Sequence, residues 1–439
     1  MDERLLWLWL SLRLPAGSKV GPKLLSHFGG VEAVYESERK RFLACEFLNH
    51  RHINALSDKD MFEAESILAF CEKYKVTLIT MGSELYPKTL ETLENPPLVL
   101  YALGKIPNFN SDLFIAVVGT RSMSDYGRVI SYGMGYNLAA GGACVVSGLA
   151  RGIDSTAQTG CLDAGGTTVA VLGCGINVVY PKENRPLMKR IVDSGGLILT
   201  EYPPNTPPHG GNFPVRNRLI CGLCQGTVVV EADRKSGALI TARQAIMQGR
   251  DLYAVPGRIN AHGSSGTNEL IKEGAQIARS ALDVLENYWF LYPHCTNLSA
   301  AKLAPPSPDR ILTVACHPEE GFDWGAYSES TPPEMPEPER KKPAPARTKK
   351  TVEKKVSEPQ LESEEEEPSV SEITPSFDTS RLSPAEQKVY SAMIPNKPMG
   401  LDDLAKCGLS SKVITGALTL LEIYGAIEAS PGGFYIRKQ

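Results

Sequence analysis

Two short apolar runs, each followed by small residues and an arginine, constrain the fold of this 439-residue chain more than any other feature. They are Ile115-Ala-Val-Val-Gly-Thr-Arg121 and Val145-Val-Ser-Gly-Leu-Ala-Arg-Gly-Ile-Asp154. A continuous apolar run is typical of a buried parallel strand, and α/β proteins place ligand loops at the carboxyl ends of such strands. Glycine lets backbone amides approach an anion, and arginine offers forked donors that suit phosphate. The predicted donors at this crevice are Gly119, Thr120, Arg121, Ser147, Gly148 and Arg151.

The same pattern of apolar strand, loop and helix-length segment repeats from residue 113 to about residue 288. Helix-length segments such as Tyr126–Ala140 and Ser155–Ala164 separate the strands. This alternation predicts an α/β fold with a doubly wound parallel sheet. The strand candidates are Phe114–Gly119, Ala143–Ser147, Thr168–Gly173, Leu197–Tyr202, Thr227–Ala232 and Leu252–Val255.

The flanking regions differ from the sheet domain in composition and pattern. Residues 1–72 predict a small helical domain with a turn at Gly21-Pro22, which resembles a helix-hairpin-helix or sterile-alpha-motif-like module. Such a module either only packs in the fold or holds a DNA backbone through loop amides. The sheet domain is expected over residues 73–290, and the proline-rich, charged segment 291–380 predicts a disordered linker.

Residues 381–439 predict a winged helix, with a capping box at Ser383–Glu386 and a final hairpin. This module carries seven Lys or Arg against five Asp or Glu. Such a small excess is weak for duplex binding, which needs several phosphate contacts. The composition therefore favours a protein-interaction or regulatory module over a DNA reader.

Charge and cysteine content limit the possible functions. The net charge is -4, so any binding of nucleic acid must rely on local basic groups. The ten cysteines are scattered, the first residues do not resemble a signal peptide, and no run is long enough to span a bilayer. These features predict a cytoplasmic protein with free thiols and no membrane association. The lone Cys221-Gly-Leu-Cys224 predicts buried thiols rather than a metal site.

Further basic residues follow the later strands, but no catalytic set accompanies them. There is neither a P-loop nor a Gly-x-Gly-x-x-Gly after the first strand, and the carboxylates have no clear acid–base spacing. Some residues have structural alternatives: Asp154 as a helix cap, Arg243 as the partner of Glu231, and one of the two arginines in the Arg-Asn-Arg sequence as an ion-pair residue. The pattern thus predicts binding of polyphosphate without a cofactor or catalysis. The added residues are Lys182, Arg216, Asn217, Arg218 and Arg243.

An ordered set of motifs closely resembles the bacterial DNA-processing DprA (Smf) family over residues 75–288. The motifs are Val118-Gly-Thr-Arg121, Ser147–Asp154, Tyr180-Pro-Lys-Glu-Asn184, Phe213-Pro-Val-Arg-Asn-Arg218, Ser236–Arg243 and Val255-Pro-Gly257. The resemblance implies an extended Rossmann-like domain that binds single-stranded DNA and forms a homodimer. It also implies loading of RecA during natural transformation and displacement of single-strand-binding protein.

The resemblance further implies roles for individual residues. Arg121 is expected to be a principal phosphate contact, and Lys182, Arg216 and Arg218 are expected to line the same pocket. The segment Thr267–Lys272 resembles the family's dimer and RecA-contact region, with Leu270 and Ile271 as candidate contacts.

Three further interpretations stay open. Aromatic residues near the basic loops either stack on bases or pack in the fold. A second function is that of a Rossmann-like nucleoside-monophosphate phosphoribohydrolase, although Pro256-Gly257-Arg258 lacks the glycine-rich loop expected of that class. A third is a transcriptional regulator that acts through the winged helix. The four aromatic residues are Tyr126, Tyr180, Tyr202 and Phe213.

Overall fold

The computed structural model describes most of the first 305 residues and parts of the C-terminal region. The described residues are 2–302, 305, 384–393, 399, 401–404, 413–414, 417–418, 421, 426–430 and 434–437. The chain divides into two compact units, Met1–Pro343 and Ala344–Gln439, which we consider separately. Of the predicted linker 291–380, only residues 291–302 and 305 are described.

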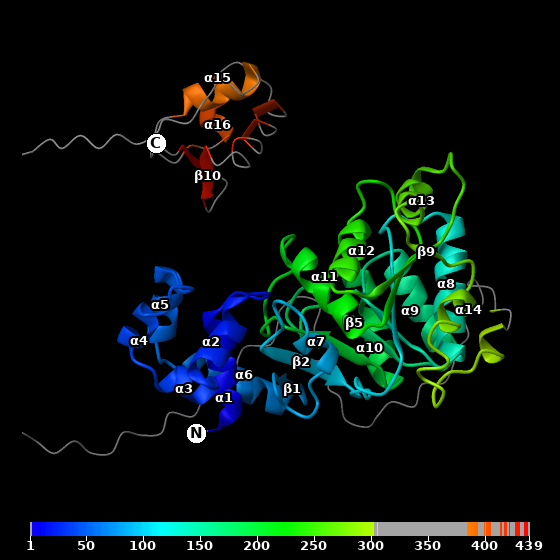
Figure 1. The fold of residues 1–439 in the computed structure, drawn as a ribbon, viewed down its shortest axis with the longest axis horizontal. Helices are drawn as coiled ribbons and strands as arrows, with labels where there is room; N and C mark the ends of the chain where they lie inside the picture. Colours follow the sequence, from blue (N-terminus) through cyan, green and yellow to red (C-terminus); the bar gives the residue numbers. More distant parts are fainter. Residues whose placement is uncertain are drawn as a thin grey trace, which may run out of the picture. The chain divides into compact units, whose positions relative to one another are not determined.

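A nine-stranded, mostly parallel sheet is the centre of the first unit (Figure 1). Its strand order is β1-β2-β6-β5-β4-β3-β7-β8-β9. The strands from β3 to β9 pair in parallel, whereas β2 pairs antiparallel with both β1 and β6. The predicted doubly wound parallel sheet is therefore confirmed. The bounds are β1 (Thr77–Thr80), β2 (Val99–Gly104), β3 (Phe114–Val118), β4 (Cys144–Ser147), β5 (Thr168–Val171), β6 (Leu197–Thr200), β7 (Gly226–Val229), β8 (Asp251–Ala254) and β9 (Gln276–Ile277).

Helices cover both faces of the sheet because successive strand residues point to opposite sides. In β3, Ile115 and Val117 join a core with α8, α9 and α14, whereas Phe114, Ala116 and Val118 join a core with α11 and α12. Helix α10 packs on the sheet within a third core. The bounds are α7 (Lys88–Glu91), α8 (Asp125–Ala140), α9 (Ile153–Asp163), η1 (Lys182–Asn184), α10 (Arg185–Asp193), α11 (Asn212–Leu223), α12 (Ala238–Met247), η2 (His262–Ser264), α13 (Ser265–Lys272), α14 (Ala281–Leu285) and η3 (Ala300–Lys302).

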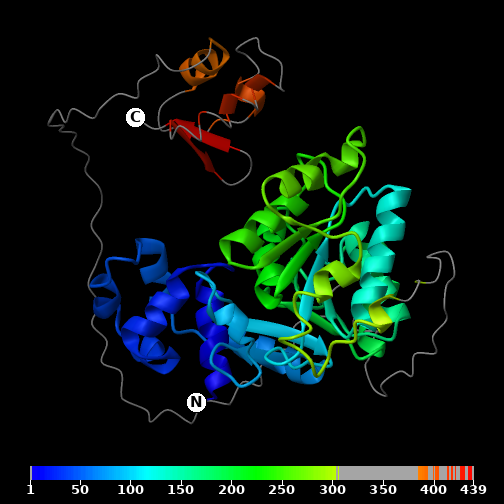
Figure 2. The same cartoon turned by 45° about the vertical axis from the view of Figure 1, so that its right-hand side comes forward.

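Six helices precede the sheet, and of these α1 contacts β1 and β2 while α6 contacts β1 (Figure 2). The central helix α1 buries Leu6–Leu10, and the same core continues through Tyr101 of β2 and Ile198 of β6. Helix α2 ends at Gly29, whose φ of 89° is the left-handed conformation that suits a glycine cap. The bounds are α1 (Glu3–Arg13), α2 (Val20–Phe28), α3 (Val31–Glu36), α4 (Arg39–Leu43), α5 (His50–Ser57) and α6 (Phe62–Lys73).

The second unit contains α15 (Pro384–Ala392), α16 (Leu401–Leu404) and a hairpin of β10 (Ile427–Ser430) and β11 (Phe434–Arg437). Arg437 holds the hairpin to α15: its guanidinium lies 4.0 Å from the Tyr390 ring centroid and donates to the Tyr390 and Met393 carbonyls. The predicted hairpin of the winged helix is thus present. Ser383 of the predicted capping box, and most of the segment expected to form the second long helix, lie outside the described residues.

The eight described cysteines are free thiols, as the sequence predicts. Cys221 and Cys224 are buried, and burial raises the pKa of the Cys221 thiol to about 12. The described residues contain no group of three or more His, Cys, Asp or Glu side chains that could hold a metal ion. Within the same residues, no helix is both long and apolar enough to cross a membrane.

Close contact between α8 and α9 depends on glycine, which gives a test of the packing. A Cβ atom on Gly135 would collide with the backbone carbonyl of Ala157. Gly135→Ala should therefore lower the free energy of unfolding by about 1–3 kcal/mol. The control is Gly133→Ala on the same helix, where the nearest atom, Pro305 Cγ, would lie 3.3 Å away. Because alanine favours helix over glycine, this control should keep or raise stability, and equal losses in the two variants would contradict the packing.

Candidate nucleic-acid interface

A large cavity lies at the carboxyl end of the parallel strands, where the strand order reverses between β3 and β7. Helices α8 and α12, which follow β3 and β7, lie on opposite faces of the sheet, so the loops after these neighbouring strands diverge there and leave a crevice. This cavity, which we call the Arg121 cavity, has a volume of about 560 Å³. Loops after β3, β4 and β5 and the first turns of α11 and α12 form its walls.

The loop after β3 is held tightly against its neighbours. Gly119 is required by space, because a Cβ atom there would lie 2.5 Å from Ile153 Cγ1 and 2.9 Å from the Glu231 carbonyl oxygen. The Thr120 amide donates to that same carbonyl at 2.8 Å, and the Glu231 carboxylate accepts from the Ser124 amide at 2.9 Å. These contacts place the backbone of Gly119 and Thr120 at the cavity wall and hold the start of α8.

Arg121 is exposed at the mouth of the cavity and is available to an anion. Its guanidinium carbon lies 5.2 Å from the centroid of the Phe213 ring, which orients the side chain through a cation–π contact. In the described part of the chain, no carboxylate lies within ion-pair distance of this guanidinium. Arg121 therefore presents forked donors to solvent, with no competing carboxylate among the described residues.

Arg216 supplies a fixed charge at the floor of the cavity. Its side chain is 4% exposed, and its Nη1 donates to the carbonyl of Gly148 at 3.0 Å and to the carbonyl of Val171. Asp154 holds the same loop from the other side, because its Oδ2 accepts from the Gly148 amide at 3.0 Å. Burial lowers the pKa of Arg216 and raises that of Asp154, and each charge partly opposes the shift of the other.

The binding residues predicted after β4 make different contacts in the structure. Ser147 is fully buried and donates from Oγ to the Val117 carbonyl at 2.7 Å, so it supports the loop from below. Gly148 lines a small inner cavity of about 50 Å³ that adjoins the Arg121 cavity. Arg151 also lines the inner cavity, but its guanidinium forms an exposed ion pair with Glu183. Lys182 is exposed in η1 and is not part of either lining.

Two of the four candidate aromatic residues lie at the cavity. The Tyr180 and Phe213 rings are 5.4 Å apart, and both line the Arg121 cavity and the inner cavity. Tyr202 is buried, and its hydroxyl donates to the Asn212 carbonyl at 3.2 Å. Tyr126 donates to the Pro256 carbonyl and lies outside both linings. Of the four candidate rings, Tyr180 and Phe213 are therefore the two that lie at the cavity.

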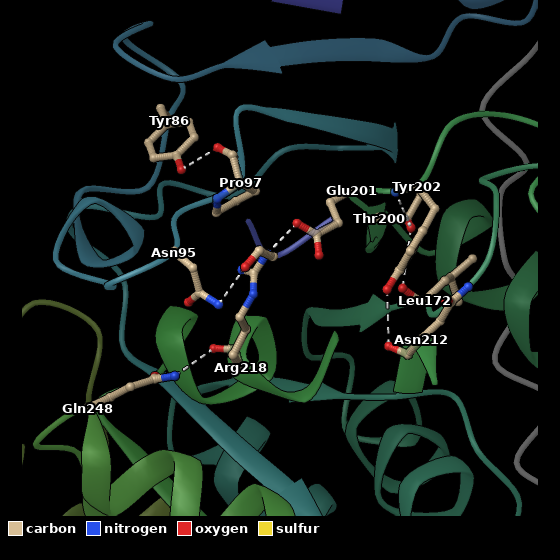
Figure 3. Close-up of polar contacts among 11 residues, drawn as sticks. Tyr86, Asn95, Pro97, Leu172, Thr200, Glu201, Tyr202, Asn212, Arg218 and Gln248 are labelled. Atoms are coloured by element: carbon tan, nitrogen blue, oxygen red, sulfur yellow. Dashed lines mark hydrogen bonds and ion pairs between the residues drawn. The ribbon is translucent and has the colours of Figure 1, made fainter. Parts of the chain in front are cut away.

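Arg218 does not join the cavity although it is only two residues from Arg216. It is buried beside the N-terminal helices, where it forms an ion pair with Glu201 (Figure 3). Asn217 lines the Arg121 cavity and accepts from Arg216 Nε at 3.2 Å. Consecutive helix residues are rotated by about 100°, so residues two apart face nearly opposite sides. The Arg-Asn-Arg sequence thus divides between the cavity and an internal ion pair.

The remaining candidates lie away from the cavity. Arg243 is exposed on α12, outside the lining, and no ion pair with Glu231 is present. Leu270 is 6% exposed and belongs to the core on the α11 face, while Ile271 packs against that core. The side chain of Leu270 is consequently not presented to a partner.

Four further residues that the sequence analysis did not predict as binding residues also line the Arg121 cavity. Pro208 and Gly210 come from the loop between β6 and α11, and Gly237 and Ile240 come from the start of α12. Ile240 is an exposed apolar side chain beside this opening. The proline- and glycine-rich composition of residues 203–211 signals a loop, but it does not indicate where that loop lies.

Two family models match this chain in sequence order. The model for DNA recombination-mediator protein A matches residues 77–289, which include the sheet, and the DprA winged helix domain matches residues 374–433. The first match contains every strand of the sheet and every residue that lines the Arg121 cavity.

Individual relatives give the same result. The chain is 40% identical over 226 residues to Protein Smf of Escherichia coli (strain K12), covering 52% of this chain and 60% of that protein. It is 40% identical over 227 residues to the DNA processing protein DprA of Streptococcus pneumoniae (strain ATCC BAA-255 / R6), covering 50% of this chain and 77% of that protein. The X-ray structure of DprA from Streptococcus pneumoniae matches with a TM-score of 0.55 and 32% identity, covering 63% of this chain and 95% of the other.

Proposed function

This chain belongs to the DprA (Smf) family of DNA-processing proteins, and we propose that it binds single-stranded DNA at the Arg121 cavity as a recombination mediator. The observation that carries the proposal is the geometry of Arg121. Its guanidinium, which has no carboxylate partner in the part of the chain that the structure describes, stacks on Phe213 at the mouth of a cavity with a second arginine at its floor. Arginine forks are well matched to phosphate oxygens.

The aromatic pair supports a single strand rather than a duplex as the ligand. Tyr180 and Phe213 offer ring faces beside Arg121, and unpaired bases stack on such faces with little dependence on sequence. In a duplex the bases are stacked on each other and their faces are not accessible. A strand whose phosphate meets Arg121 can place a neighbouring base against this pair.

The lining is suited to binding rather than to catalysis. Asp154 is the only carboxylate among the described lining residues of the Arg121 cavity. Its carboxylate accepts a hydrogen bond from the Gly148 amide and interacts with the Arg216 charge. The described lining therefore offers no second carboxylate that could form an acid–base pair with Asp154. Glu231 is likewise engaged with the Ser124 amide. We therefore propose a non-enzymatic role and do not favour a phosphoribohydrolase.

The proposed mediator role extends to partners. By its family, the chain would act in the cytoplasm as a homodimer that loads RecA onto the bound strand and helps to displace single-strand-binding protein. Since Leu270 is buried and Ile271 packs on the same core, a partner at α13 would meet exposed residues such as Lys272 and Glu273. Lys182 and Arg151, which are exposed near the cavity, are proposed as secondary contacts for phosphates.

Salt-dependent binding tests the proposed ligand. The full chain should bind a thymidine strand more tightly than a duplex of equal length, and log K should fall linearly with log salt. Each phosphate neutralised on a single strand contributes about -0.7 to that slope. Fluorescence anisotropy of labelled strands over a range of salt concentrations measures both quantities. Equal affinity for the two ligands, or affinity that does not depend on salt, would contradict the proposal.

A further inference from the structure

The inner cavity beside the Arg121 cavity concentrates positive charge around a small space of about 50 Å³. Arg121, Arg151 and Arg216 all contribute to its walls. The loops after β4 and β5 and the aromatic pair complete these walls, and none of the described lining residues is acidic. Asp154, the carboxylate of the Arg121 cavity, does not line the inner cavity. The lining therefore suits an anion.

Arg216 keeps part of its guanidinium available to a ligand in this cavity. Its Nε donates to Asn217 Oδ1, and its Nη1 donates to the carbonyls of Gly148 and Val171. No described residue accepts a hydrogen bond from Nη2, and Nη2 is not among the unpaired atoms that the protein covers completely. This nearly buried arginine thus offers accessible donors on a fixed side chain.

Arg121 and Arg151 can add donors from the solvent side of the inner cavity. In the described part of the fold, Arg121 has no carboxylate partner. The partner of Arg151 is Glu183, but the side chains of this pair are 63% and 49% exposed. An ion pair so accessible to water contributes little free energy, so an anion in the cavity can draw Arg151 away from Glu183. All three arginines can therefore reach one bound anion.

The size of the inner cavity determines which group of a DNA strand fits. One water molecule needs about 10–15 Å³ of such volume, so the inner cavity has room for about three or four. A nucleobase is larger than this, whereas the phosphorus and three terminal oxygens of a phosphate monoester are of matching size. An internal phosphate carries a sugar on each side, but a terminal phosphate carries only one, which can stay in the Arg121 cavity. The residues that line both cavities are Arg121, Ala150, Tyr180, Phe213 and Arg216.

The charge of the lining also favours a terminal phosphate. A phosphate monoester carries a charge of about -1.5 to -2 at pH 7 and has three strong acceptor oxygens. An internal phosphate of a strand carries one negative charge and has two unesterified oxygens. Three guanidinium groups can therefore satisfy every free oxygen of the monoester, through hydrogen bonds between charged groups that are stronger than neutral ones.

We propose that the inner cavity binds the terminal phosphate of a single strand, with Arg121, Arg151 and Arg216 as its donors. The inference rests on the proposed binding of single-stranded DNA at the Arg121 cavity. It adds a preference for phosphorylated strand ends to a site that otherwise contacts internal phosphates and bases. Because the adjoining nucleotides occupy the larger Arg121 cavity, the ligand is a strand end rather than a free nucleotide.

Changes in the ligand provide the first test. The full chain is titrated with thymidine strands that carry a fluorophore on an internal base and end in hydroxyls, a 5′-phosphate or a 3′-phosphate. A phosphate at one of the two ends should raise affinity about tenfold over hydroxyl ends, the effect of one added hydrogen bond between charged groups. A terminal methyl phosphate has only the charge of an internal phosphate, so it should remove most of this gain.

A protein variant locates the effect. Arg151→Ala removes an exposed side chain from the wall of the inner cavity, and it should lower the gain from the terminal phosphate at least threefold. The matched control is Lys182→Ala, which removes an exposed charge nearby that does not line the inner cavity. This control should weaken binding of hydroxyl-ended and phosphorylated strands by the same factor, so that the gain is kept.

The outcomes separate this inference from the proposed function. If neither terminal phosphate gives a gain while Arg121→Ala weakens binding of hydroxyl-ended strands, the end site is wrong and the DNA-binding function stands. If Arg121→Ala has no effect on those strands, the proposed function itself fails. A gain that survives methylation of the phosphate, or that falls equally in Arg151→Ala and Lys182→Ala, would overturn the inference. Thymidine 5′-monophosphate that competes as well as a phosphorylated strand would also overturn it, since the site would then hold free nucleotides.

Discussion

Arg121→Ala should weaken binding of single-stranded DNA by the full chain about ten- to hundredfold. The guanidinium has no carboxylate partner among the described residues and lies over Phe213 at the cavity mouth, so its donors are free for phosphate. A hydrogen bond to a charged group contributes about 1.5–3 kcal/mol, which corresponds to this loss. Anisotropy titrations at several salt concentrations should also show a slope smaller by about one phosphate contact.

Arg151→Ala is the matched control for that experiment. Arg151 lies on the neighbouring loop, but its guanidinium already pairs with Glu183, so its replacement should cost less affinity than that of Arg121. Thermal unfolding checks that both variants are folded. An Arg121 variant with unchanged affinity, or a larger loss from Arg151→Ala, would place the phosphate contact elsewhere.

Arg218→Met should destabilise the protein by about 3–5 kcal/mol, because it leaves the buried Glu201 carboxylate without its partner. Chemical unfolding followed by the fluorescence of Trp7 and Trp9 reports this, since both belong to the core that the N-terminal helices share with the sheet. The salt dependence of DNA binding should not change, because Arg218 lies outside the Arg121 cavity.

The loss of stability in Arg218→Met should depend on pH in a defined direction. Burial raises the pKa of Glu201, and the charge of Arg218 opposes that rise. Without Arg218 the folded-state pKa rises further above the unfolded value, so the folded variant binds a proton more readily than the unfolded chain. Its stability should therefore increase as the pH falls, and the deficit relative to the unmodified protein should shrink. A deficit that does not depend on pH would contradict a charged, unpaired Glu201.

A double variant distinguishes lost charge from lost packing. Glu201→Leu with Arg218→Met removes both charges together and should recover much of the stability, because no unpaired ion remains. If the double variant is as unstable as Arg218→Met alone, the packing of Arg218 rather than its charge holds the N-terminal helices to the sheet.

Much of the sheet domain was predictable because its strands are continuous apolar runs that end in glycine or small polar residues. The six strands predicted between residues 113 and 288 all occur, and their ends converge at one edge. Strand β2 was less evident, since prolines before Val99 resemble an extended connector. Its strand character arises from pairing with β6, a contact that is distant in sequence.

The roles of individual arginines could not be read from their positions in the sequence. Arg216 and Arg218 occupy one turn of α11, and only the packing of that helix decides that Arg216 faces the cavity while Arg218 faces the N-terminal helices. The same holds for Leu270, whose helical neighbours do not reveal that it points into the core. Arg121 was easier to predict, because it directly follows a strand end and a required glycine.

The most direct test of the account is a crystal structure of the full chain bound to a short thymidine strand. We predict a phosphate within hydrogen-bond distance of the Arg121 guanidinium and a base against Tyr180 or Phe213, with the strand along the carboxyl edge of the sheet. A strand bound to the winged helix or the N-terminal helices, with no contact to Arg121, would contradict the central claim.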